Sequence, residues 1–164
     1  MSGLARMIGT VLGTGYLKPA PGTWGSLVAL PMAWVIHVIG GLPLLLIAVI
    51  AAFVKGWWAT GEMTKGQTDH DPSEIVVDEV VGQWIALLPL SYAAWSMEMS
   101  ILVMWPGWIA AFALFRLFDI WKPGPVGWAD RRGDALGVML DDVIAGVFAA
   151  IGVLVLAGLY HGVG

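Results

Sequence analysis

The residues best suited to chemistry are carboxylates, and ten of the twelve acidic residues lie in residues 69–79 and 119–142. Two adjacent pairs, Asp78-Glu79 and Asp141-Asp142, each precede apolar residues, and Asp119 lies near the end of another apolar stretch. Where three helix ends meet, these carboxylates can converge on one hard divalent cation. Oxygen ligation without a His or Cys cluster suits Mg²⁺, with Mn²⁺ as a substitute. We therefore predict all five as metal ligands, against the alternative that acids at helix starts only complement the helix dipole.

Two basic residues accompany Asp119. Arg116, Asp119 and Lys122 are spaced three residues apart, so they share roughly one helix face. Arginine binds phosphate bidentately and lysine as a point charge, which predicts Arg116 and Lys122 as phosphate-binding residues. The alternative is an Arg116–Asp119 ion pair, with Lys122 as a positive anchor at the membrane surface. Pro123 and Pro125 follow at once and are expected to stop the helix at Lys122.

Other polar residues extend this candidate site. Beside a metal and a phosphate, Asp78, Glu79, Asp119 and Asp142 are the candidate catalytic residues, and Asp71 or Glu79 could serve as general base. Residues 21–26 (PGTWGS) are expected to form a loop before a helix, in which Thr23 and Ser26 can contact a phosphate. A simple helix cap is the alternative use of these hydroxyls. His70 and Arg131 are further candidates because they lie near the acids in sequence.

The composition defines the setting of these residues. Of 164 residues, 59% are hydrophobic and only 12% are charged, whereas a soluble domain has about a quarter charged residues. This predicts an integral-membrane protein with a single domain over residues 1–164. The net charge of −4 argues against a nucleic-acid partner. The absence of cysteine excludes disulfides, thiolate metal sites and a cysteine nucleophile. The first 25 residues lack the features of a cleaved signal peptide.

The apolar pattern predicts an all-α fold, a small polytopic bundle of about five apolar helices. Expected turns are residues 40–43 and 89–100, and Pro106-Gly107 is expected to kink the fourth helix. The third helix is expected to start at Pro72 or Ser73, because Asp-Pro-Ser-Glu is a helix-start signal. The predicted helices are 27–39, 42–60, 72–88, 101–118 and 138–160.

The basic residues predict the orientation. Lys and Arg occur in the N-terminal segment, in residues 55–79 and in residues 116–137, while the turns at 40–43 and 90–100 and the tail have none. The positive-inside rule then places the charged helix ends in the cytoplasm, with five crossings. A short internal similarity supports this arrangement: each acidic pair heads an apolar helix and is followed by a glycine, Gly82 or Gly146.

Four blocks of the sequence resemble the phosphatidylglycerophosphatase A family of bacterial lipid phosphatases. They are PGTWGS at 21–26, IVVDEVVGQW at 75–84, FRLFDIWKPGPV at 115–126 and GVMLDDVIAG at 137–146. The resemblance implies a multi-pass protein of the bacterial inner membrane with its site facing the cytoplasm. It implies Mg²⁺-dependent removal of the terminal phosphate of phosphatidylglycerophosphate, giving phosphatidylglycerol. The matching residues are the five acids and two bases named above. One departure is Asp134-Ala135, where the family often has two glycines.

Two other classes of function remain open from the residues alone. A small ion or proton transporter would place its carboxylates near the middle of the bilayer, often on broken helices. A structural membrane subunit would use the interfacial acids without needing basic residues beside them. The expected position of the acids at helix ends on one side favours an enzyme at the membrane surface over both.

Overall fold

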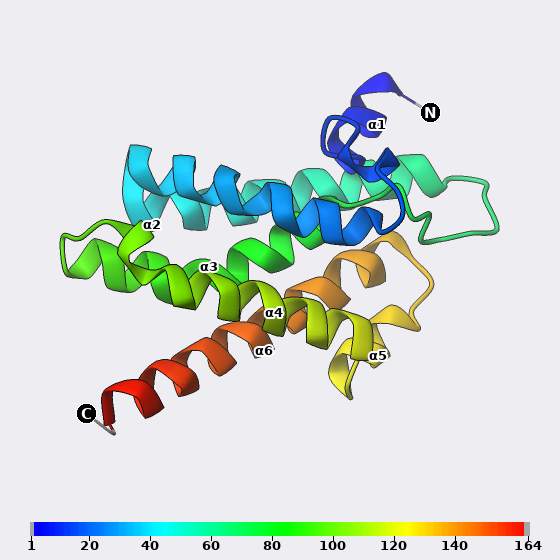
Figure 1. Cartoon of the computed structure of the whole chain (residues 1–164). Helices are drawn as coiled ribbons and strands as arrows, with labels where there is room; N and C mark the ends of the chain where they lie inside the picture. Colours follow the sequence, from blue (N-terminus) through cyan, green and yellow to red (C-terminus); the bar gives the residue numbers. More distant parts are fainter. Residues whose placement is uncertain (1, 163–164) are drawn as a thin grey trace.

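The computed structural model describes residues 2–162, and nearly all of its regular structure is helical (Figure 1). No strand occurs among these residues, so the predicted all-α class is confirmed. The helices are α1 (Gly3–Gly9), η1 (Thr14–Tyr16), α2 (Pro21–Thr64), α3 (Val77–Ser96), η2 (Ile101–Met104), α4 (Trp105–Trp121), α5 (Pro125–Asp130) and α6 (Ala135–Gly162).

The longest helix, α2, is a hairpin of two arms. Its backbone leaves helical geometry at Gly40 and Gly41, and Figure 1 shows the second arm running back beside the first. Gly41 has φ +60°, and a Cβ atom there would lie 2.6 Å from a ring carbon of Trp95. The reversal therefore requires glycine. This agrees with the turn predicted at residues 40–43.

Helix α3 forms the centre of the bundle, where 13 of its 20 residues are buried. It packs between α2, α4 and α6, and it crosses α6 at Gly82 and Gly146. A Cβ atom on Gly82 would lie 2.6 Å from the carbonyl oxygen of Asp142, and one on Gly146 would overlap the carbonyl of Gly82. Small residues allow such close helix contacts in membrane proteins.

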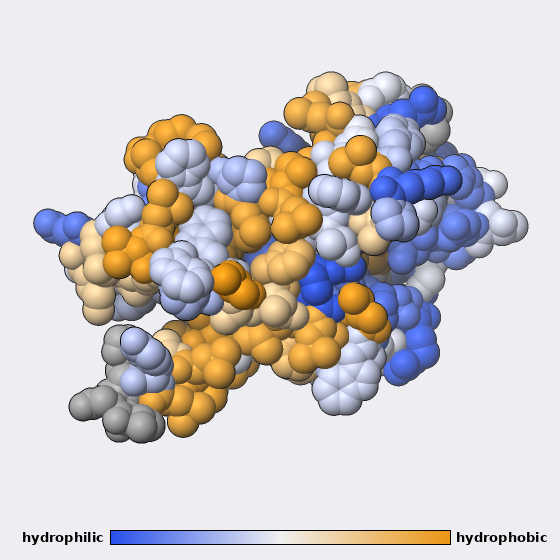
Figure 2. All heavy atoms as spheres, in the orientation of Figure 1, coloured by the Kyte–Doolittle hydropathy of each residue, from blue (hydrophilic) through white to orange (hydrophobic). Residues whose placement is uncertain are grey.

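The outer surface of the bundle is apolar. Three helices are long and apolar enough to cross a membrane: Pro21–Thr64, Ile101–Trp121 and Ala135–Tyr160. Figure 2 shows hydrophobic side chains over the body of the molecule and hydrophilic ones gathered at its right-hand end, here called the charged end. The number of crossings stays a prediction, although the two arms of α2 with α3, α4 and α6 give five antiparallel passes (Figure 1).

Exposed aromatic residues lie near both ends of these passes. At the charged end they are Tyr16, Trp24, Trp57, Trp58, Trp121 and Trp128, and toward the opposite end Trp34, Tyr92, Trp95, Trp105 and Tyr160. Tryptophan and tyrosine are enriched at both membrane–water interfaces. Along α4 the two groups are separated by about 24 Å, from the helical rise between Trp105 and Trp121. That spacing is close to the ~30 Å thickness of a bilayer core.

Several predicted boundaries are wrong. Residues 21–26 are helical rather than a loop, because Pro21 occupies the first helical position, where its fixed φ is favourable. The third helix begins at Val77, not at Pro72 or Ser73, because Asp69 and Pro72 accept hydrogen bonds from Asp71 and Ile75 in a non-helical turn.

Two proline predictions are also wrong. α3 continues through Pro89 to Ser96, since its other backbone bonds keep the helix intact within the bundle. Pro106-Gly107 does not kink a helix, because α4 begins at Trp105 and Pro106 lies in its first turn. Helices α1 and α5 had no counterpart in the prediction. They are short, so they carry little periodic signal.

Candidate active site

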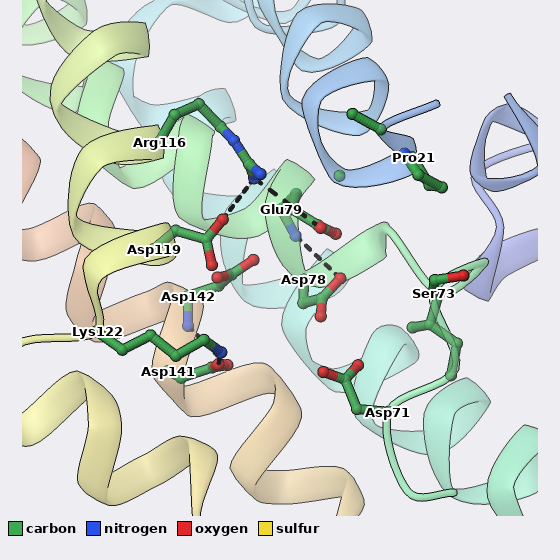
Figure 3. A pocket seen from close by; sticks show the side chains of 13 residues that line it. Pro21, Asp71, Ser73, Asp78, Glu79, Arg116, Asp119, Lys122, Asp141 and Asp142 are labelled. Atoms are coloured by element: carbon green, nitrogen blue, oxygen red, sulfur yellow. Dashed lines mark hydrogen bonds and ion pairs between the residues drawn. The ribbon is translucent and has the colours of Figure 1, made fainter. Parts of the chain in front are cut away.

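A cavity of about 310 Å³ lies at the charged end, where the bundle carries its acids (Figure 3). It is formed by the start of α2, the loop before α3, the start of α3, the end of α4 and the first turns of α6. Its lining residues are Ala20, Pro21, Gly22, Asp71, Ser73, Ile75, Asp78, Glu79, Arg116, Asp119, Lys122, Asp141 and Asp142. Six carboxylates and two basic side chains therefore face one small space.

The crossing of α3 and α6 explains how the two acidic pairs meet. Gly82 is one helical turn after Asp78, and Gly146 is one turn after Asp142. Because the helices touch at the two glycines, the residues one turn earlier lie next to each other at the charged end. Asp78 and Asp142 are both almost fully buried. The short internal similarity in the sequence thus corresponds to a structural relation.

The carboxylate oxygens form two groups suited to a cation. One group is Asp78, Glu79 and Asp142, the other is Asp119, Asp141 and Asp142, and within each the ligand atoms lie within 4.8 Å of one another. Oδ2 of Asp142 and Oε2 of Glu79 are buried without a hydrogen-bond partner among the described residues. Buried carboxylate oxygens need such a partner, and an all-oxygen set fits a hard divalent cation.

Arg116 connects three helices at the inner edge of the cavity. Its Nη1 lies 2.5 Å from Oδ2 of Asp119 and 4.0 Å from Oε1 of Glu79. The same atom donates a long hydrogen bond of 3.5 Å to Oγ of Ser26 on α2. Nε of Arg116 is buried and has no partner among the described residues. The guanidinium therefore has unused donor capacity beside the acids.

Lys122 forms the opposite wall. Its Nζ donates to Oδ1 of Asp130 at 2.5 Å and to Oδ2 of Asp141 at 2.6 Å. Burial lowers the pKa of Lys122, but the two carboxylates outweigh that effect and hold the pKa above its ordinary value. Lys122 is the C-cap of α4 and has φ +51°, which turns the chain toward α5. The amine is thus a fixed positive charge.

Asp71 reaches the cavity from the loop before α3. Its side chain touches solvent, yet partial burial among protein atoms raises the pKa of Asp71. The positive charge of Lys122 opposes this increase, and the neighbouring acids, Asp130 first among them, add to it. A carboxyl group with a raised pKa is suited to proton transfer near neutral pH.

The first turn of α2 packs directly against the side chains of the site, whereas the sequence predicted a loop there. A Cβ atom on Gly22 would collide with Oε1 of Glu79 and would lie 3.2 Å from Nη1 of Arg116. Sequence reasoning missed Gly22, Ser73 and Asp130 as neighbours of the site. Gly22 lies within the PGTWGS block and Asp130 is one of the clustered acids, whereas nothing in the sequence distinguishes Ser73.

The remaining candidates lie outside the cavity lining. Ser26 is fully buried behind the wall and contacts the site through two lining residues: Oγ of Ser26 accepts from Arg116 and donates to the carbonyl of Gly22. Thr23, on the first turn of α2, does not line the cavity. His70 and Arg131 are exposed and also lie outside the lining. The structure thus brings the five acids, Asp71 and the two bases together.

Comparison with known proteins identifies the family. A family model described as "Phosphatidylglycerophosphatase A" matches residues 7–157. Phosphatidylglycerophosphatase A of Haemophilus influenzae is 35% identical over 148 residues, which cover 89% of this chain and 84% of that protein. Its namesake in Escherichia coli is 34% identical over 160 residues, covering 96% and 86%.

A third relative has a different name. A Bacteroides thetaiotaomicron protein named as a candidate phosphatidylinositol-3-phosphatase is 38% identical over 154 residues, covering 90% of each chain. No solved structure matches this chain significantly. The match over most of the sequence, together with a cavity lined by the acids and bases of the four sequence blocks, shows that this chain belongs to the phosphatidylglycerophosphatase A family.

Proposed function

We propose that this protein is a Mg²⁺-dependent phosphatidylglycerophosphate phosphatase of the bacterial inner membrane, with its site facing the cytoplasm. It would hydrolyse the terminal phosphomonoester to phosphatidylglycerol and inorganic phosphate. Family membership supports the reaction and the substrate. The apolar helices support a membrane location, and the basic residues of the N-terminal segment and of the α4–α6 connection support the orientation.

The observation that carries this proposal is the buried Oδ2 of Asp142, which has no hydrogen-bond partner among the described residues, on a carboxylate that belongs to both groups of acids. The cavity lining has a formal excess of four negative charges, which is as large as the net charge of −4 for the whole chain. Without a cation, a phosphate would meet a repulsive surface. Asp78, Glu79 and Asp142 would hold Mg²⁺ on one side of the cavity, and Asp119 with Asp141 would extend the ligand set on the other.

The residues of the chain then have separate tasks. Bound Mg²⁺ would supply charge neutralisation at the phosphate and a water of lowered pKa. Arg116 and Lys122 would donate hydrogen bonds to phosphate oxygens and offset the charge that develops there. Glu79 or Asp71 would accept a proton from the attacking water. The water oxygen forms a bond to phosphorus, the bond from phosphorus to the glycerol oxygen breaks, and that oxygen takes up a proton.

The position of the site supports an enzyme over a transporter. The acids lie at one end of the bundle, at the start of α3, the end of α4 and the first two turns of α6, rather than midway along the passes. A lipid phosphate is found at this depth, because its acyl chains occupy the bilayer beside the apolar helices. A transporter would need ionisable groups near the bilayer midplane.

The test is phosphate release by the purified protein in detergent–lipid micelles. Phosphatidylglycerophosphate, phosphatidylinositol 3-phosphate and phosphatidic acid are compared at equal surface concentration, each with Mg²⁺ and with EDTA. We expect the fastest release from phosphatidylglycerophosphate and no release in EDTA. A preference for the inositol lipid would assign the activity of the third relative instead. Release that persists in EDTA would refute the metal requirement.

Matched variants distinguish a loss of activity at the site from a loss of folding. Asp142→Asn and Asp119→Asn are expected to remove activity while the helical circular dichroism and the unfolding temperature stay near those of the wild type. Asp134→Asn is the control, because Asp134 pairs with Arg132 at the surface outside the cavity. Mn²⁺ binding, followed by electron paramagnetic resonance, gives a readout apart from turnover. Full activity of Asp142→Asn would show that the site is misassigned.

A further inference from the structure

The N-terminal segment presents an apolar surface that the bundle does not use. Five large side chains, here called the N-terminal patch, point outward from α1, η1 and the turns around them, and Leu12 is 81% exposed. The other members are Leu4, Met7, Tyr16 and Leu17. The opposite side of α1 is packed, because Ala5 and Gly9 are buried and Gly9 lies against Met63. Figure 2 shows hydrophobic atoms over this part of the molecule, at the upper right.

The patch lies at the level of the membrane surface. α1 packs on Ala59 and Met63, near the end of α2. The exposed Trp57 and Trp58 lie on the same arm, directly before Ala59 and about one and a half turns before Met63. The apolar surface of the first arm of α2 begins close by, at the exposed Trp24. The N-terminal patch is therefore a continuation of the lipid-facing surface rather than an isolated apolar area.

Its charges are of one sign. Residues 2–20 contain Arg6 and Lys18 and no acidic residue. Neither cation appears in any ion pair among residues 2–162. Apolar side chains flanked by unpaired cations match the boundary between acyl chains and anionic headgroups.

We propose that the N-terminal segment, residues 2–18, lies in the plane of the membrane surface and binds anionic phospholipid headgroups of the bilayer that the bundle spans. The N-terminal patch enters the headgroup–acyl boundary, and Arg6 and Lys18 contact lipid phosphates. A second copy of the chain or a partner protein is not required to cover this surface.

The position of the segment gives this contact a structural consequence. Val76, the N-cap of α3, donates its N–H to the carbonyl of Gly9 at 2.9 Å. Gly15 packs directly on the backbone carbonyl of Glu74, with no space for a Cβ atom. The segment that binds lipid thus holds the residues immediately before Asp78 and Glu79.

The natural absence of cysteine allows a direct test by spin labelling. Single variants Met7→Cys and Leu12→Cys carry a nitroxide in the full protein, reconstituted in vesicles of phosphatidylcholine and phosphatidylglycerol. Thr68→Cys, in the polar loop before α3, is the aqueous control, and Ile151→Cys, exposed on α6, is the bilayer control. Power saturation compares collisions of each label with oxygen and with a water-soluble nickel chelate, and thereby measures depth.

We expect the labels at positions 7 and 12 to lie about 5–10 Å inside the lipid phosphates, between the two controls. Collision rates equal to those of the Thr68→Cys label would show that the segment lies in water and would overturn the proposal. Low collision rates with both oxygen and the chelate would indicate burial in a protein contact and would overturn it as well. The role of the cations is tested in the Leu12→Cys protein by adding Arg6→Gln or Lys18→Gln. In anionic vesicles each substitution should lower the population ratio of label in the lipid to label in water about five-fold, because one headgroup contact is lost. Equal ratios with and without these cations would refute the headgroup contact. The measurement is independent of phosphatase activity.

Discussion

Replacing Gly82 by alanine tests whether the α3–α6 crossing places the carboxylates. The added Cβ would lie 2.6 Å from the carbonyl oxygen of Asp142, and ordinary contacts begin at 3.4 Å, so the helices must separate by about 0.8 Å. The ring of Phe115 occupies the same space. Overpacking of this kind costs about 1–3 kcal/mol, partly offset by the ~0.5–1 kcal/mol that alanine gains over glycine in a helix.

The catalytic effect should exceed the effect on stability. Asp78 and Asp142 would move apart by most of that separation, and a displacement near 1 Å reduces turnover by up to about 100-fold. We expect Gly82→Ala to lower kcat about 10–100-fold and to weaken Mn²⁺ binding. The unfolding temperature in detergent should fall by at most about 10 °C, from a net cost of up to ~2.5 kcal/mol at ~2–4 °C per kcal/mol.

Gly158→Ala is the matched control, because it adds the same methyl group to α6 at a position with open space. It should leave activity and Mn²⁺ binding unchanged and should not lower the unfolding temperature. Wild-type activity of Gly82→Ala, with stability equal to that of Gly158→Ala, would refute the argument that the close crossing sets the site. Equal loss of activity in both variants would refute it as well.

Three further substitutions have distinct expected outcomes. Arg116→Lys keeps the charge but cannot maintain contacts to three helices, so kcat/KM should fall about 10–100-fold with little change in Mn²⁺ affinity. Lys122→Gln leaves Asp141 without its cation, and we expect loss of activity and a decrease in stability of about 1–3 kcal/mol, measured by denaturation in detergent. Trp84→Phe removes the buried hydrogen bond to the carbonyl of Ala29 and should lower stability by ~1 kcal/mol while activity is retained.

Each of these has an outcome that contradicts it. Unchanged activity of Arg116→Lys would show that one point charge is sufficient at this position. For Lys122→Gln the control is Lys65→Gln, an exposed lysine with no ion pair among the described residues. Equal stability of the two lysine variants would show that the Asp141 contact contributes nothing. An inactive but stable Trp84→Phe would indicate a role of the first arm of α2 in the reaction.

The elements with long apolar segments or clustered charges could be predicted from the sequence. Long apolar segments separated by Gly40-Gly41 predicted the hairpin of α2. They also predicted helices long and apolar enough to cross a membrane, as α2, α4 and α6 are. Acidic pairs at the starts of apolar segments predicted that carboxylates from three helices share one end, which the cavity now shows geometrically. Their roles as ligands stay predictions. These successes depend on periodicity and charge, which are properties of single segments.

Properties that depend on neighbours were not predictable in the same way. Asp71 was a candidate general base, but its place in the cavity depends on the turn in which the N–H of Ile75 donates to the carbonyl of Pro72. Asp130 approaches Lys122 because α5, a helix of six residues, packs against α6 and ends at Asp130 within hydrogen-bond distance of the lysine. Helix continuation through Pro89 likewise depends on the surrounding bundle.

Gly82 and Gly146 explain why the short internal similarity in the sequence predicted the position of the two acidic pairs. An acidic residue followed four positions later by glycine is a common pattern, and a single instance indicates nothing about a site. Two instances on helices that cross at those glycines fix the distance between the acids, because each acid lies one turn from the contact point. The carboxylate geometry is then set by backbone contact in the apolar bundle rather than by flexible loops. The apolar helices and the candidate active site are in this sense one structure: any change that separates α3 from α6 also separates Asp78 from Asp142.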